Sequence, residues 1–152
     1  MKARIHTDTS VRGGCEDDEF REPSRRLLEA FQRGELTLVL SELTVRELEG
    51  APEAVRAVLG RVPDEHIEAL ALSPEAEDLA SAYIADGAIG ARMHVDALYI
   101  ALATVARVDV LVSWNCNHVV NLKRIHAYNA VNLKRGCPLL EIRTPREVSG
   151  DE

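Results

Sequence analysis

The chain has 152 residues, 46% of them hydrophobic, which is sufficient for one domain, 1–152, with a core of its own. Its net charge of −7 argues against a protein whose whole surface binds nucleic acid, and its three cysteines lack the C-x-x-C spacing of a zinc site. No run of 18 apolar residues and no signal-peptide pattern occur, so we expect a cytoplasmic protein without a membrane segment.

Strand and helix patterns alternate along the first half of the chain. A strand is expected at 3–8, and a helix at 23–34 opens at Pro23-Ser24 and closes at Gly34. The other elements expected in this half are a strand at 36–41, helices at 42–50 and 52–60, and a short strand at 66–72.

The second half continues the alternation. Ser73 and Pro74 provide an N-cap and a first-turn proline for a helix at 74–87. The segment 95–106 is apolar on every face, which predicts a helix buried against the sheet. The elements expected after it are a strand at 108–113, a polar helix from about Asn117, a turn at Gly136 and a last strand at 138–143.

This βαβα order predicts the fold class. Parallel strands joined by right-handed crossovers require helices on both faces of the sheet. We therefore expect an α/β fold, a three-layer α/β/α sandwich with a central parallel sheet.

Polar residues stand where the predicted strands end. Asp8 follows the first strand, Ser41 ends the second, and Asn115 follows the strand at 108–113. Because the carboxyl ends of parallel strands lie along one edge, where such folds bind their ligands, we expect these residues to lie close together.

Two acids on predicted helices can join this edge. Glu47 shares an i, i+4 stripe with Leu43, so it is expected to face an apolar neighbourhood, and Asp96 lies in the first turn of the buried helix. Each acid also has a purely local explanation: Asp8 can form a turn, Glu47 can pair with Arg46, and Asp96 is a favourable charge at the start of a helix. Together, however, three converging carboxylates need a counter-charge, and oxygen ligands favour Mg²⁺ or Mn²⁺.

Five motifs give the chain a resemblance to a known family. Over residues 3–148 it resembles the PIN-domain superfamily, of the PilT N-terminal type, which includes the VapC-type ribonuclease toxins. The motifs are "DTSV", "SELTVREL", "HVDALYIALA", "LVSWNCNH" and "IRTPREV". The resemblance implies an α/β/α sandwich that binds Mg²⁺ or Mn²⁺ through three or four acids.

Carried over by position, the resemblance makes Asp8, Glu47 and Asp96 the metal ligands. The family often has an aspartate where this chain has Asn115, and sometimes another where it has Asn117. An amide carbonyl at Asn115 can ligate the cation or orient a water, but it adds no negative charge. We therefore expect a catalytic set of Asp8, Glu47, Asp96 and Asn115 with weaker metal affinity, or with one metal in place of two.

A basic segment near the end of the chain is a candidate RNA contact. Residues 107–152 carry 7 Lys/Arg and 5 Asp/Glu, whereas residues 1–106 carry 11 and 20. The sequence "VNLKR" occurs at 120–124 and again at 131–135. In an unbroken helix both basic pairs would share a face. That face could attract a polyanion, or it could simply be a solvated surface. The candidate nucleic-acid contacts are Thr9, Ser10, Arg12, Lys123, Arg124, Lys134 and Arg135.

The sequence thus favours metal-dependent hydrolysis of RNA phosphodiester bonds, with an antitoxin protein as a further partner. The alternative is a non-catalytic PIN-fold module that binds nucleic acid or protein. A haloacid-dehalogenase phosphatase is disfavoured because Ser10 stands where it needs a second aspartate, and a Rossmann domain lacks its glycine motif. We also expect a homodimer, formed through apolar stripes of "RRLLEAF" and "AVRAVL".

Overall fold

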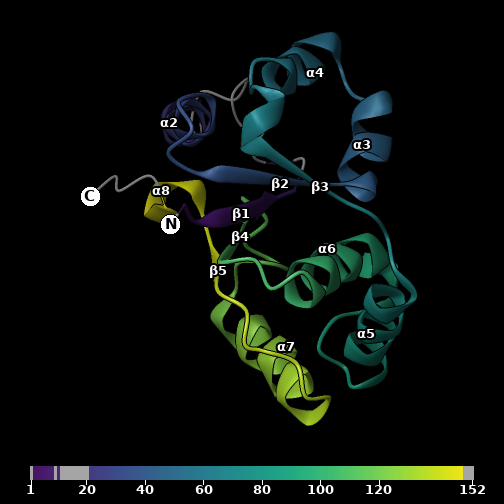
Figure 1. Cartoon of the computed structure of the whole chain (residues 1–152). Coiled ribbons are helices and arrows are strands. Elements are labelled where there is room, and N and C mark those ends of the chain that lie inside the picture. Colours follow the sequence, from purple (N-terminus) through teal and green to yellow (C-terminus); the bar gives the residue numbers. More distant parts are fainter. Residues whose placement is uncertain (1, 9, 11–20, 149–152) are drawn as a thin grey trace.

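The computed structural model of the chain describes residues 2–8, 10 and 21–148. In this part of the chain five parallel strands form one sheet in the order β3-β2-β1-β4-β5 (Figure 1). The strands are β1 (Arg4–Thr7), β2 (Thr37–Ser41), β3 (Ile67–Leu70), β4 (Val110–Val112) and β5 (Ile142–Arg143).

Helices cover both faces of this sheet, so the predicted three-layer α/β/α arrangement is confirmed. Helices α2 and α4 lie on one face, and α5, α6 and α7 lie on the other (Figure 1). The helices are α2 (Arg21–Gln32), α3 (Glu42–Glu49), α4 (Glu53–Gly60), α5 (Pro74–Ala85), α6 (His94–Val105), α7 (Leu122–Lys134) and α8 (Pro145–Val148), with short 3-10 turns at Asp64–His66 and Ala91–Met93. None of these helices is long and apolar enough to span a membrane.

The two faces of the sheet carry separate apolar cores, because successive strand side chains point to opposite sides. In β2, Leu38 packs toward α2 and α4, whereas Val39 packs toward α5 and α6. In β4 the neighbours Val112 and Leu111 divide in the same way. The central side chains of β2 and β4 are therefore committed to packing in the two cores.

Helix α6 is the buried helix that the sequence predicted. Every residue from Ala97 to Thr104 is buried. The ring of Tyr99 on this helix lies against the ring of His6 in β1, with centroids 5.6 Å apart. The helix thus fixes its first turn, which carries Asp96, relative to the end of β1.

Most elements lie within two residues of their expected bounds, but α7 and β5 begin several residues later than expected. Helix α7 begins at Leu122 and not near Asn117, because the side chain of Asn121 caps it by accepting a hydrogen bond from the Arg124 backbone nitrogen at 3.2 Å. Strand β5 is confined to residues 142–143, since the Leu140 backbone pairs with the Asn129 side chain instead of a strand (N to Oδ1 2.8 Å, O to Nδ2 3.2 Å). The turn at Gly136 is confirmed, and its φ of 73° suits glycine.

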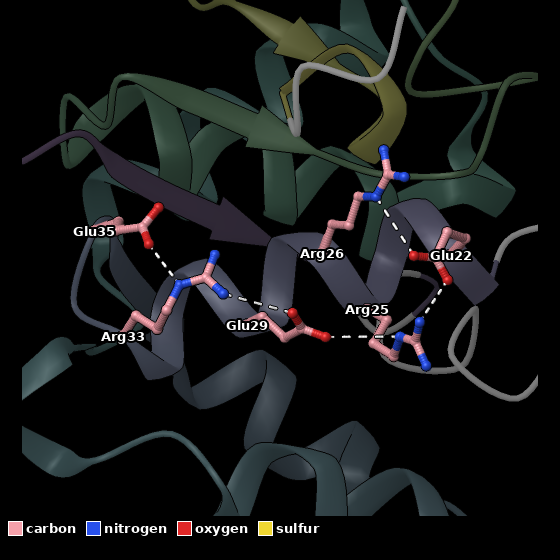
Figure 2. A network of polar contacts seen from close by, with 6 residues as sticks. All are labelled: Glu22, Arg25, Arg26, Glu29, Arg33 and Glu35. Carbon is pink, nitrogen blue, oxygen red and sulfur yellow. Dashed lines mark hydrogen bonds and ion pairs between the residues drawn. The ribbon is translucent and has the colours of Figure 1, made fainter.

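Helix α2 does not offer the apolar stripe expected at a dimer interface. Its side chains Leu27, Leu28 and Phe31 are buried inside the chain, as is Val58 of α4. A chain of ion pairs runs along α2 and the residues that directly follow it (Figure 2). The members of this chain are Glu22, Arg25, Arg26, Glu29, Arg33 and Glu35. These four apolar side chains are therefore not available for a dimer interface. The homodimer stays a prediction.

Candidate active site

Asp8 is the centre of the polar cluster at the carboxyl edge of the sheet. It follows β1 and is only 6% exposed. One carboxylate oxygen accepts hydrogen bonds from the Ser10 backbone nitrogen, at 3.1 Å, and from the Ser10 hydroxyl. The other accepts from the Ser113 hydroxyl at 2.5 Å. The carboxylate is therefore held in one orientation from both sides.

The same two serines tie the end of β1 to the end of β4. The Ser113 hydroxyl oxygen also accepts from the Asn115 backbone nitrogen at 2.9 Å, and that of Ser10 accepts from the Trp114 backbone nitrogen at 3.0 Å. Ser10, which the sequence placed among the RNA contacts, therefore supports Asp8. Ser113 was missed, although a serine at the end of an apolar strand beside Asn115 was the available signal.

Asn115 faces Asp96 with its amide nitrogen. Its Nδ2 donates to Asp96 Oδ2 at 3.2 Å, while its Oδ1 accepts from the backbone nitrogens of Asn117 and His118 at 3.2 and 3.0 Å. In this arrangement two backbone donors occupy the Asn115 carbonyl oxygen, and its role as a cation ligand stays a prediction. The amide nitrogen of Asn115 positions the Asp96 carboxylate.

Glu47 lies on α3 and reaches the site through Tyr99. Its side chain is exposed, so the expected apolar environment is wrong; Leu43, one turn earlier, is buried. The Glu47 carboxylate accepts a hydrogen bond from the hydroxyl of Tyr99, whose ring is buried. Tyr99 was not predicted as a site residue, although its position three residues after Asp96 on α6 places both on one helix face.

Ser41, at the end of β2, caps α3: its hydroxyl accepts a hydrogen bond from the Thr44 backbone nitrogen at 3.4 Å.

The three carboxylates interact electrostatically. Burial raises the pKa of Asp8, the hydrogen bonds from Ser10 and Ser113 act against this, and the negative charge of Asp96 raises it further. Burial also raises the pKa of Asp96; His118 lowers it and the charge of Glu47 raises it. Asp8 and Glu47 are thus each coupled to Asp96, and the site carries a concentration of negative charge that a cation would relieve.

The chemistry of these donors fits a hard divalent cation, because carboxylate oxygens are the ligands that Mg²⁺ and Mn²⁺ prefer. Within the described residues, however, no three His, Cys, Asp or Glu side chains are arranged to hold one metal ion. Asp96 accepts a hydrogen bond from Asn115, and Glu47 accepts one from Tyr99. The ligand set of Asp8, Asp96 and Glu47 therefore stays a prediction.

The basic residues differ in how far they are available. Lys123 is exposed on α7, and one guanidinium nitrogen of Arg124 donates to the Ala88 carbonyl at 2.9 Å. Lys134 forms an exposed ion pair with Asp86, after the end of α5, at 2.7 Å. This pair offsets the charge of Lys134, and its expected role in attracting RNA stays a prediction. Arg135 is exposed after the end of α7. The candidate contacts Thr9 and Arg12 lie outside the described residues.

Comparison with known proteins finds similarity to solved structures. No family model and no curated protein sequence matches the chain. Among solved structures, VapC20 of Mycobacterium tuberculosis, a toxin that cleaves the sarcin-ricin loop, superposes with a TM-score of 0.57 over 75% of this chain and 92% of that one, at 13% identity. A chain of VapBC2 from Rickettsia felis, solved with a DNA fragment from the promoter, gives 0.55 over 93% and 98%, at 15% identity.

The class that the topology and these similarities define is the α/β/α PIN fold, as the sequence resemblance predicted. Within that class, the two similar structures are VapC20 and VapBC2, and this chain has a fold like theirs.

Proposed function

We propose that this protein is a metal-dependent endoribonuclease that hydrolyses phosphodiester bonds of RNA. The observation that carries the proposal is the buried Asp8 carboxylate, fixed by two serines and coupled by charge to Asp96 at the carboxyl edge of the sheet. Burying a carboxylate beside a second one costs stability, and a function that uses the charge explains why the cost is tolerated. The fold supports this proposal, because VapC20, a protein of similar fold, is a toxin that cleaves the sarcin-ricin loop.

Each residue has a task in this reaction. Asp8, Asp96 and Glu47 would hold Mg²⁺ or Mn²⁺, which when bound activates water and offsets charge on the transferring phosphate. Ser10 and Ser113 orient the Asp8 carboxylate and favour its ionised form through their hydrogen bonds. Asn115 orients Asp96. With an amide in place of a fourth acid, we expect one cation to be bound more readily than two.

The test is cleavage of a single-stranded RNA with Mn²⁺ and with EDTA. We expect cleavage only with Mn²⁺, and its loss in Asp8→Asn. Asp78→Asn is the matched control, since it makes the same chemical change on the exposed side of α5. Cleavage that persists in EDTA, or that survives Asp8→Asn at the level of the Asp78→Asn protein, would refute the proposal.

An antitoxin protein is the proposed partner, because one of the similar structures is a VapBC pair. A small protein encoded directly upstream should co-purify with this chain and suppress the RNA cleavage. The proposed homodimer is tested separately by light scattering, where a mass of 16.8 kDa would denote a monomer.

The second candidate function is a non-catalytic PIN module that binds RNA or protein. It is favoured by Asn115, whose amide stands at the fourth acid position and is fully engaged in hydrogen bonds. This candidate predicts RNA binding that is equal with Mn²⁺ and with EDTA, with no cleavage in either.

A further inference from the structure

A cleft opens beside the candidate active site on the side of α7. It encloses about 380 Å³ between the turn after α5 and the N-terminal half of α7. Its lining residues are Gly87, Ala88, Asn117, Asn121, Lys123, Arg124 and Ala127. One lining residue contacts the site directly: the Asn117 backbone nitrogen donates to Asn115, which in turn donates to Asp96.

The lining offers positive charge and amide groups. Lys123 is exposed and makes no ion pair with any residue that the structure describes. Arg124 uses one guanidinium nitrogen on the Ala88 carbonyl, and a guanidinium has five N–H donors, so others remain for an anion. The amide of Asn117 is exposed at the mouth and can both donate and accept. These groups suit a phosphate together with a polar ring edge.

The repeated sequence "VNLKR" sharpens this assignment. Its first copy places Lys123 in the cleft, whereas its second places Lys134 against Asp86 at 2.7 Å. Two lysines of one helix in the same local sequence therefore have different environments. Asp86, which caps the C-terminus of α5, pairs with Lys134, whereas Lys123 has no ion pair among the described residues.

We infer that this cleft is a subsite for one nucleotide of a single-stranded RNA, adjacent to the bond that is cut. Lys123 and Arg124 contact the phosphate, and Asn117 pairs with the edge of the base. The volume lies in the range of small-ligand pockets, about 300–1,000 Å³, which fits one nucleotide better than an extended acidic peptide. Amide side chains also pair well with base edges. The inference rests on the proposed function for the identity of the substrate.

The experiment measures RNA binding without cleavage. A short fluorescent single-stranded RNA is titrated with Asp8→Asn protein in EDTA, and with the same protein carrying Lys123→Gln or Lys134→Gln. Both substitutions remove one positive charge from α7. We expect Lys123→Gln to weaken binding and to reduce the slope of log K against log salt by about 0.7, the value for one lost contact to a single strand. We expect Lys134→Gln to leave the slope unchanged.

Equal effects of the two lysine substitutions would overturn the subsite, because they would show a general effect of charge. So would binding of an acidic peptide that depends on Lys123 while RNA fails to bind. Asn117→Ala should weaken RNA binding without changing the salt slope, since an amide releases no counterions. If the Lys123 effect is found but the wild-type protein cuts no RNA with Mn²⁺, the proposed nuclease fails and the RNA subsite stands.

Discussion

The substitution Asn115→Asp places a new charge against an existing one. The amide nitrogen that donates to Asp96 at 3.2 Å becomes a carboxylate oxygen, so an attractive contact becomes a repulsive one. The other oxygen keeps its two backbone donors, those of Asn117 and His118, and holds the new carboxylate in place. The repulsion therefore cannot be relieved by a simple rotation of the side chain.

The size of the effect follows from this distance. Two unit charges at 3.2 Å repel by about 5 kcal/mol at an effective dielectric of 20 and by about 1 kcal/mol in bulk water. Asp96 is half-buried, so the interaction lies between these limits. We expect the metal-free variant to lose about 2–4 kcal/mol of unfolding free energy at pH 7.5, including the lost hydrogen bond to a charged acceptor.

The loss should depend on pH in a defined direction. Repulsion raises the pKa of the carboxyl pair in the folded variant above its unfolded value, so the folded variant binds a proton more tightly than the unfolded chain does. The destabilisation is therefore greatest at neutral pH and shrinks as the pH falls through the raised pKa.

Denaturant unfolding in EDTA at pH 5 and pH 7.5 measures this difference. Asn117→Asp is the control, because it makes the same change two residues away on an exposed side chain and should shift stability by no more than about 0.5 kcal/mol. Titration calorimetry with Mn²⁺ completes the test, since a further carboxylate should tighten binding. A loss that is the same at both pH values, together with an unchanged Mn²⁺ dissociation constant, would refute the reasoning.

Three further predictions concern the same framework. Tyr99→Phe removes the hydroxyl that orients Glu47 and should weaken Mn²⁺ binding about 10-fold by calorimetry, whereas Tyr83→Phe, which loses a buried hydroxyl bonded to Asn132, should leave it unchanged. Asp8→Asn should make the metal-free protein more stable at pH 7.5, by about 1.4 kcal/mol for each unit by which the pKa of Asp8 in the folded protein exceeds its unfolded value. Denaturant unfolding should find that this gain vanishes as the pH falls toward 3.8, and a gain that is constant with pH would count against the prediction. Glu68→Gln should lower the free energy of unfolding by less than about 1 kcal/mol at pH 7, because the ion pair between Glu68 and Arg4 is about one-third exposed. The hydrogen bond from Arg4 lowers the pKa of Glu68, so thermal melts should show this cost disappearing as the pH falls below 4.5.

The order of elements was predictable because hydrophobic patterns dominate it. The apolar segment 95–106 could only be a buried helix, and α6 is that helix. The last strand was predicted too long, because the pattern of residues 138–143 could not reveal that Asn129 binds the Leu140 backbone from α7. A side chain eleven residues away in the chain decides where that strand begins.

The site was predictable in composition but not in orientation. Parallel strand ends explain why Asp8 and Asn115 meet at one edge. The direction of the Asn115 amide could not be read from sequence, because it is set by the backbone turn at residues 117–118. Tyr99 escaped notice for a related reason, since a tyrosine in an apolar helix is normally a core residue and only the fold brings its hydroxyl to Glu47.

The position of Trp114 gives the protein a natural optical probe. It is the single tryptophan of the chain, and its backbone nitrogen binds Ser10 while its indole nitrogen donates to Ser24 of α2 at 2.8 Å. The indole thus lies between the residue that fixes Asp8 and the start of the first described helix. Its emission should change whenever a cation or an RNA strand alters the edge formed by β1 and β4, so binding can be followed by fluorescence without a label.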